Sequence, residues 1–139
     1  MINEAPKGDL PAKPVRVLLA EDEVLVRVMV ADILRGEGLQ VFEASDGEDG
    51  ISILNAIPVD VVVTDLRMSA FADGLELARH VRAHCSGVSL ILASAQAPPI
   101  VEGLTFDAFF VKPYPPGDLV AWIKRRYAST PDAAGSAVS

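Results

Sequence analysis

The chain has 139 residues, the length of one domain on the usual scale of about 100 to 200 residues, and it is half apolar and only 22% charged, which excludes an intrinsically disordered chain. Its 19 acidic and 12 basic residues give a formal net charge of -7, the wrong sign for direct binding to a nucleic-acid backbone. A single cysteine, Cys85, excludes an internal disulfide framework. Because no apolar run reaches about 18 residues and the N-terminus is polar, we expect a cytoplasmic protein without a membrane span or signal peptide.

Strand and helix patterns alternate along the chain. In chain order, they predict a strand at Val15–Ala20, a helix at residues 24–34, a strand at Leu39–Ala44, a helix at residues 46–56, a strand at Val59–Thr64, a helix at Gly74–His84, strands at Val88–Ala93 and Ala108–Val111, and a helix at Pro116–Tyr127. Gly36 and Gly38 are stop signals for the first helix, and Asp46 is a candidate cap for the second. Three of the strands are continuous apolar runs, as in strands buried on both faces.

This alternation predicts an α/β fold with right-handed crossovers and a parallel sheet covered by helices on both faces. For a chain of this length, we expect a doubly wound sheet of five strands in the spatial order 2-1-3-4-5. One domain is expected at residues 15–128. The stretches at residues 1–14 and 129–139 are rich in Pro, Gly, Ala and Ser, and we expect mobile tails there.

Polar residues follow four of the predicted strands. Glu21 and Asp22 come after the first strand, Asp65 after the third, Ser94 after the fourth and Lys112 after the fifth. The carboxyl ends of parallel strands open on one edge, and ligands of such sheets bind there, near the point where the strand order reverses. The sequence therefore predicts three carboxylates, one hydroxyl and one ammonium in a single site.

Three carboxylates in one site need a cation or a raised pKa. Two like charges about 4 Å apart repel by roughly 4 kcal/mol at an effective dielectric near 20. A ligand set made only of oxygen atoms suits Mg²⁺. Taken singly, each residue has a simpler explanation: an acidic residue after a strand is often only a helix cap, and Lys112 and Ser94 could be ordinary loop residues.

With these residues in place, the sequence resembles the receiver domains of two-component response regulators over roughly Val15–Tyr127. The matching stretches are Val-Leu-Leu-Ala-Glu-Asp-Glu at residues 17–23, Asp-Val-Val-Val-Thr-Asp-Leu-Arg-Met at residues 60–68, Asp73-Gly74, Ser94-Ala95 and Phe109-Phe110-Val111-Lys112-Pro113. All five occur in order and near the usual spacing. The resemblance implies a flavodoxin-like receiver architecture, and a histidine kinase or histidine phosphotransfer protein as phosphoryl donor.

The resemblance also implies a role for each site residue. Asp65 would be the phosphoryl acceptor, with Ser94 and Lys112 contacting the phosphoryl oxygens. Mg²⁺ (or Mn²⁺) would be bound by Asp22, Asp65 and the backbone carbonyl of Arg67, and by Glu21 through water. Phe109 would be the aromatic switch residue, for which simple core packing is an equal alternative. Arg67 and Gln96 occupy the positions that tune hydrolysis.

The chain departs from the family pattern in three places, one of which is the pair Arg67 and Gln96. Ser69 replaces the usual proline after Met68, and Gly74 lies nine positions after Asp65 rather than eight. Ser94 and Lys112 are 18 positions apart, about four fewer than in chemotaxis-type receivers, and Pro98 and Pro99 leave room for at most a short fourth helix.

Three functions remain open from the sequence. The first is a stand-alone module that signals through protein contact when phosphorylated. The second is a receiver-like scaffold that does not switch, and the altered loop after Met68 is its only support. The third is a Mg²⁺-dependent phosphohydrolase, which is disfavoured because Arg67 stands where phosphatases of the haloacid dehalogenase type have a second aspartate.

Overall fold

The computed structural model describes residues 13–68, 71–96 and 104–128, which contain five strands and four helices. In chain order, these are β1 (Arg16–Ala20), α1 (Val24–Gly36), β2 (Gln40–Ala44), α2 (Gly47–Ala56), β3 (Val61–Asp65), α3 (Phe71–His84), β4 (Ser89–Ser94), β5 (Ala108–Val111) and α4 (Pro116–Tyr127). No helix in these ranges is long and apolar enough to cross a membrane.

The five strands form one sheet in the order β2-β1-β3-β4-β5, with every neighbouring pair parallel. The predicted doubly wound architecture is confirmed. Strand β1 pairs with β2 on one side, where Ala20 faces Ala44, and with β3 on the other, where Ala20 faces Thr64. The strand order therefore reverses at β1, next to the strand that carries Asp65.

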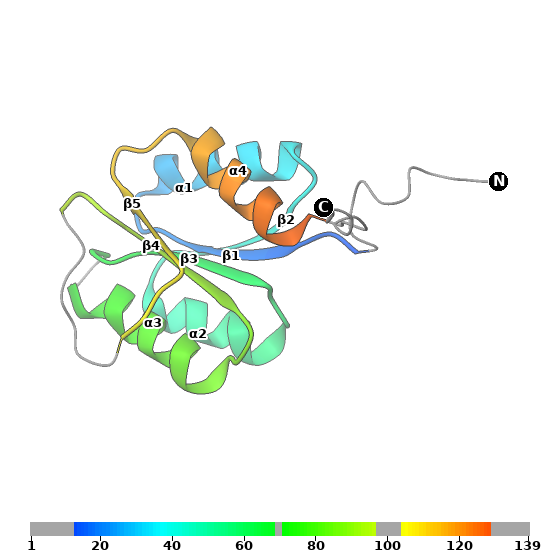
Figure 1. The fold of residues 1–139 in the computed structure, drawn as a ribbon. Helices are drawn as coiled ribbons and strands as arrows, with labels where there is room; N and C mark the ends of the chain where they lie inside the picture. The colour runs from blue at the N-terminus through cyan, green and yellow to red at the C-terminus, as the bar shows by residue number, and fades with distance from the viewer. Residues whose placement is uncertain (1–12, 69–70, 97–103, 129–139) are drawn as a thin grey trace.

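Helices cover both faces of the sheet: α1 and α4 lie on one face and α2 and α3 on the other (Figure 1). Each face has its own apolar core. Leu34 of α1 and Ile123 of α4 pack in the first core, and Leu77 of α3 packs in the second. Because β3 and β4 are buried along their whole length, these strands need apolar side chains on both faces, which explains their continuous apolar runs.

The strand bounds differ slightly from the sequence prediction, and the difference matters for the site. β3 ends at Asp65 and β4 ends at Ser94, so both residues belong to their strands rather than to the loops that follow. The backbone of each is therefore held by the sheet: Asp65 pairs with Ala93, and Ser94 pairs with Val111.

The helices follow their local signals, with one correction. Asp46 caps α2 as predicted, because its side chain accepts a hydrogen bond of 2.8 Å from the backbone N–H of Asp49. α1 ends at Gly36, and Gly38 takes the left-handed conformation with φ of 92°. α3 begins at Phe71, three residues before the predicted start at Gly74, which lies inside the helix.

α1 is apolar on two sides rather than one. Val30, Ala31 and Leu34 are buried against the sheet. On the other side, exposed apolar side chains run along the helix: Val24, Leu25, Val28, Met29 and Ile33. Among the described residues, Val111 is the other large apolar side chain that is exposed. Periodicity predicts the helix correctly, but it does not separate these two sides.

Three predictions lie wholly or largely outside the described residues. The two expected tails fall mostly at residues 1–12 and 129–139, and the short fourth helix falls mostly at residues 97–103. The described part of that last stretch, residues 104–107, is not helical.

Candidate functional site

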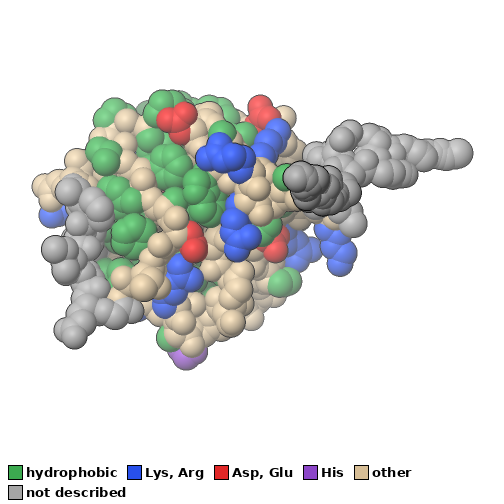
Figure 2. Space-filling model, in the orientation of Figure 1, with side chains coloured by type: hydrophobic (Ala, Val, Ile, Leu, Met, Phe, Trp, Pro, Cys, Tyr) green, Lys and Arg blue, Asp and Glu red, His purple; other side chains and the backbone are tan. Residues whose placement is uncertain are grey.

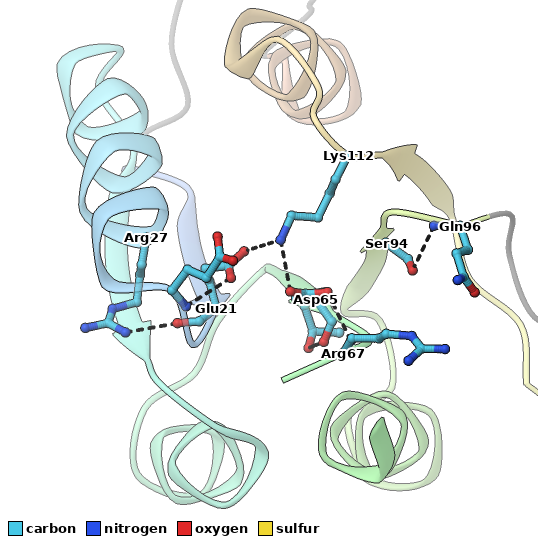
Figure 3. Close-up of polar contacts among 9 residues, drawn as sticks. Glu21, Arg27, Asp65, Arg67, Ser94, Gln96 and Lys112 are labelled. Carbon is cyan, nitrogen blue, oxygen red and sulfur yellow. Dashed lines mark hydrogen bonds and ion pairs between the residues drawn. The ribbon is translucent and has the colours of Figure 1, made fainter. Parts of the chain in front are cut away.

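The residues predicted from the strand ends meet at the carboxyl edge of the sheet, as Figure 3 shows. Glu21 and Asp22 follow β1, Asp65 ends β3, and Ser94 ends β4. Lys112 follows β5 and reaches back across the edge to the two acidic strands. Parallel strands bring these residues together although Glu21 and Lys112 are 91 positions apart in the sequence.

Three carboxylates form a compact cluster in this site. One oxygen each from Glu21, Asp22 and Asp65 lies within 4.8 Å of the other two. Glu21 and Asp65 are buried, and Asp22 is half-buried at the opening. A donor set of oxygen atoms, carrying several negative charges and partly open to water, fits Mg²⁺, which keeps some of its waters when it binds a protein. The residues present therefore fit the predicted cation.

Lys112 bridges two of the carboxylates. Its Nζ donates to Oε1 of Glu21 at 2.9 Å and to Oδ2 of Asp65 at 3.0 Å. Burial alone would lower the pKa of Lys112, but the two hydrogen bonds and the charges of both carboxylates outweigh burial and raise it. The ammonium therefore keeps its proton and holds the acidic residues together.

The pKa of Glu21 is raised despite its ion pair with Lys112. Burial raises it most, and the negative charge of Asp65 adds to this effect. The hydrogen bonds from Lys112 and from the backbone N–H of Glu23, at 2.9 Å and 3.1 Å, offset only part of the rise. Any further cation that enters the site would stabilise the charged form of this carboxylate.

The backbone around Asp65 fixes its carboxylate. The backbone N–H of Arg67 donates to Oδ1 of Asp65 at 3.0 Å. Oδ2 faces Lys112, so the two oxygens have different partners. Gly74 of α3 packs against the backbone of Asp65 and Leu66, where there is no room for a side chain. Although Gly74 lies nine rather than eight positions after Asp65, it still packs against the backbone at the end of β3.

Ser94 and Gln96 lie on the other side of Asp65. The Ser94 side chain is buried, and its Oγ accepts a hydrogen bond of 3.3 Å from the backbone N–H of Gln96. The backbone N–H of Lys112 donates to the carbonyl of Ser94 at 2.8 Å, which ties the end of β4 to the loop that carries the lysine.

Phe109 packs in one of the two apolar cores. It is half-buried in the apolar core beneath α2 and α3, with its ring centroid 6.1 Å from that of Phe106. The next residue, Phe110, points to the opposite core and packs on Tyr114, with centroids 5.4 Å apart. The placement of Phe109 satisfies ordinary core packing and leaves part of the ring at the surface.

Two residues at the site were not predicted from the sequence. Arg27 of α1 donates from Nη1 to the backbone carbonyl of Glu21 at 2.9 Å. Tyr114 lies close enough to Glu21 and Asp65 for their charges to affect it, and its pKa is raised to about 12, mainly by burial.

Fold and site together place the chain among the receiver modules of two-component signalling, which are not conventional enzymes. The chain belongs to the response regulator receiver domain family, whose model matches residues 17–124.

Curated relatives and solved structures agree with this assignment. The transcriptional regulatory protein PdtaR of Mycobacterium tuberculosis is 32% identical over 117 residues, which cover 81% of this chain and 57% of that protein. The DNA-binding response regulator MtrA of Mycobacterium leprae is 29% identical over 121 residues, covering 84% of this chain and 53% of that protein. The chain thus spans a little over half the length of these curated relatives.

Two solved structures show the same fold. A CheY-like receiver domain from Methanospirillum hungatei superposes with a TM-score of 0.74 at 22% identity, covering 83% of this chain and 94% of that chain. The response regulator TrrA of Thermotoga maritima, solved in complex with Mg²⁺-BeF, superposes with a TM-score of 0.71 at 25% identity, covering 80% of this chain and 97% of that chain.

Proposed function

We propose that this domain accepts a phosphoryl group on Asp65 from the phosphohistidine of a histidine kinase or histidine phosphotransfer protein. The arrangement of Asp65 carries the proposal. Its carboxylate is fixed on one oxygen by the backbone N–H of Arg67 and on the other by Lys112, in a cluster that fits a divalent cation. Phosphoryl transfer needs mainly positioning and charge stabilisation, and this site supplies both.

The reaction is a single displacement at phosphorus. A carboxylate oxygen of Asp65 attacks the phosphorus, and the bond between phosphorus and the donor histidine nitrogen breaks with its electron pair left on that nitrogen. The product is an acyl phosphate on Asp65, and the donor leaves as a neutral imidazole because its other ring nitrogen carries a proton or the released nitrogen takes one from water. Lys112 offsets negative charge on the phosphoryl oxygens, and Ser94 donates its hydroxyl hydrogen to one of them.

Asp22, Asp65 and the backbone carbonyl of Arg67 would bind Mg²⁺ directly, and Glu21 would bind it through water. The bound ion would offset charge on the transferred group. Asp22 is the half-buried carboxylate of the cluster, so it is the one through which the ion enters.

We further propose that phosphorylation changes the surface near β4 and β5. A phosphoryl group that draws the Ser94 hydroxyl toward Asp65 would remove it from the N–H of Gln96, its present partner at 3.3 Å. Phe109 is half-buried and pairs with Leu92, two residues before Ser94, and it is the ring that we expect to respond to this change. The output is then read by a downstream protein through contact, in the cytoplasm and without direct binding to nucleic acid.

We propose that the phosphoryl donor docks on the exposed apolar side of α1. Val24 is 57% exposed and Leu25 is 85% exposed, and α1 begins two positions after Asp22 at the rim of the acidic cluster. Figure 2 looks onto α4 and β5, with α1 behind them; apolar side chains also gather toward the carboxyl edge of this face, whereas Lys and Arg side chains lie toward the C-terminal end of α4. A donor that brings its histidine to Asp65 must cover this rim, so the surface with which it docks needs apolar side chains.

Mass spectrometry after incubation with acetyl phosphate and Mg²⁺ tests the acceptor. The wild-type chain should gain one phosphoryl mass, and Asp65→Asn should gain none while keeping its fold. Asp32→Asn, which removes a carboxylate from the outer side of α1, is the matched control and should be labelled like the wild type. A labelled Asp65→Asn chain would overturn the assignment.

Titration calorimetry with Mg²⁺ tests the ligand set. We expect weak binding to the unphosphorylated protein, because a site of carboxylates and water must partly dehydrate the ion. Asp22→Ala should weaken this binding more than Glu21→Ala, since the first is assigned as a direct ligand. Unchanged affinity in both variants would contradict the set.

Leu25→Gln tests the donor surface. It should slow labelling by a phosphorylated histidine phosphotransfer protein and leave labelling by acetyl phosphate unchanged, because the small donor needs no docking surface. Equal rates with the protein donor would exclude this side of α1.

The lifetime of the acyl phosphate depends on Arg67 and Gln96, which flank Asp65 and Ser94. An amide orders an attacking water less well than a carboxylate, so we expect a phosphorylated form that lasts minutes or longer. A half-life of seconds would contradict this expectation. A receiver-like scaffold that does not switch is the alternative, and it predicts no labelling of the wild type at all.

A further inference from the structure

We propose that Arg27 is a positioning residue for the acidic loop, which it holds through the backbone carbonyl of Glu21. The inference rests on the proposed function in one respect: it takes the Asp22 carboxylate of this loop as a direct ligand of Mg²⁺. Arg27 itself touches neither that carboxylate nor the acceptor in the contacts found for the described residues.

The geometry around Arg27 is specific. Its Nη1 donates to the carbonyl of Glu21 at 2.9 Å, and its Nε donates to Oε1 of Glu43 at 3.2 Å. The Arg27 side chain is only 16% exposed, so the guanidinium lies mostly out of water. The N–H groups of a buried guanidinium need hydrogen-bond acceptors. Here the acceptors are the carboxylate of Glu43 and the backbone carbonyl of Glu21.

Glu43 of β2 is anchored from a second side. Arg35 donates from Nη1 to Oε2 of Glu43 at 3.0 Å and from Nη2 to the carbonyl of Val41 at 2.8 Å. Each oxygen of Glu43 therefore has its own arginine, and the carboxylate cannot turn without losing one of them. Arg27 therefore keeps an oxygen of its own, Oε1, whether or not Arg35 occupies Oε2.

Both backbone polar groups of Glu21 are then tied to β2. The N–H of Glu21 donates directly to the carbonyl of Ala44 at 3.0 Å, and the carbonyl of Glu21 is held through Arg27 and Glu43. Figure 3 shows the two ends of this residue held from opposite sides, the carbonyl by Arg27 and the carboxylate by Lys112.

The consequence falls on Asp22. The carbonyl of Glu21 belongs to the same planar peptide unit as the nitrogen of Asp22, so fixing the carbonyl fixes the plane from which the Asp22 side chain departs. Without Arg27 this peptide can rotate, and the Asp22 oxygen leaves the 4.8 Å cluster for part of the time. Groups that orient a metal ligand in this way typically change metal affinity by about 10- to 100-fold.

Arg27→Met and Arg35→Met form the matched pair for the test. Both remove an arginine that pairs with Glu43, but only Arg27 contacts the acidic loop. We expect Arg27→Met to weaken Mg²⁺ binding about tenfold and to slow labelling by acetyl phosphate, while Arg35→Met stays within about twofold of the wild type on both measures. Arg27→Lys, which keeps the charge but loses the planar fork, should resemble Arg27→Met.

Two further measurements separate positioning from loss of fold. In the metal-free protein, the amide resonance of Asp22 should shift in Arg27→Met and stay in place in Arg35→Met. In an Asp22→Asn background, Arg27→Met should cause no additional loss of Mg²⁺ affinity, because the residue through which it acts has gone.

The outcomes are distinguishable. Suppose that the wild type binds Mg²⁺ and is labelled. If a folded Arg27→Met variant then behaves like the wild type, or if Arg35→Met loses as much Mg²⁺ affinity as Arg27→Met, the positioning role of Arg27 is wrong. The acceptor proposal stands in either case. If the wild type neither binds Mg²⁺ nor is labelled, the proposed function falls and this role falls with it.

Discussion

Gly74 of α3 lies against the peptide that joins Asp65 to Leu66, so closely that a Cβ atom on Gly74 would come within 2.6 Å of the Cα of Leu66. The other atoms in the way are backbone carbonyl oxygens of Asp65 and Leu66, which cannot turn aside as a flexible side chain can. The strand that ends at Asp65 and the helix that follows it are therefore in direct backbone contact.

Gly74→Ala should destabilise the domain and disturb Asp65. Overpacking usually costs about 1–3 kcal/mol, and a clash with backbone should reach the top of this range or exceed it. Gly117→Ala is the matched control, because Gly117 is also helical and has nothing within 4 Å of its Cβ position. The control should be neutral or gain up to about 1 kcal/mol. Urea unfolding of both variants measures the difference, and equal stabilities would contradict the contact.

Lys112→Met should cost far more stability than Lys124→Met. Lys112 is 20% exposed and its partners Glu21 and Asp65 are 7% and 6% exposed, so removing the ammonium leaves two carboxylates uncompensated, at about 3–5 kcal/mol. Lys124 and its partner Glu37 are both nearly half exposed, so that pair is worth less than about 1 kcal/mol. Chemical denaturation at neutral pH tests this. Added Mg²⁺ should restore part of the loss in Lys112→Met only.

Alkaline pH should weaken the fold through Tyr114. Burial and the nearby carboxylates raise the pKa of Tyr114 to about 12 in the folded chain, whereas an unfolded tyrosine titrates near 10. Between these values the native state binds more protons than the unfolded state, so the free energy of unfolding falls as pH rises. The raised pKa of Lys112 acts in the same direction above its ordinary value of 10.5.

Tyr114→Phe should therefore flatten the loss of stability between about pH 10 and pH 12. The pKa itself can be measured in Tyr127→Phe, because the chain has two tyrosines and this variant leaves Tyr114 as the one phenol that titrates. An absorbance titration of that variant centred near 10 would contradict the burial of Tyr114.

Arg82 should hold the segment before β5 against α3. It donates to the carbonyl of Thr105 at 2.7 Å and to Oδ2 of Asp107 at 2.9 Å. Asp107 also accepts from the backbone N–H of Leu90 at 2.8 Å. Although burial raises the pKa of Asp107, these hydrogen bonds outweigh it and lower the pKa, so the stabilisation is present above about pH 3.8 and is lost as pH falls further.

Arg82→Met should speed amide hydrogen exchange at residues 104–107 while costing only about 1 kcal/mol of global stability, because Asp107 is 40% exposed and solvent screens the pair. Arg79→Met, on the exposed side of the same helix, is the control and should leave exchange there unchanged. Slower or equal exchange in Arg82→Met would show that the segment is held by its apolar contacts alone.

The sheet could be predicted from the sequence because buried parallel strands are continuous apolar runs, and the topology then brings the strand ends to one edge. This reasoning located Glu21, Asp22, Asp65, Ser94 and Lys112 together. It could not find Arg27, because that side chain acts on a backbone carbonyl, and sequence patterns report side chains rather than the peptide groups they reach. The exposed apolar side of α1 could not be predicted for another reason. Val24 and Val30 are both apolar residues of the same helical pattern, although the first is exposed and the second is buried.

The ion pair between Glu21 and Lys112 joins residues 91 positions apart, which directly follow the first and last strands in chain order. During synthesis the carboxylates of Glu21, Asp22 and Asp65 leave the ribosome well before the lysine that offsets them. A chain that stops before β5 carries the acidic residues without their ammonium and without the hydrogen bond that fixes Oδ2 of Asp65. The site described here is therefore complete only with the last strand, and the proposed phosphoryl transfer to Asp65 requires that strand.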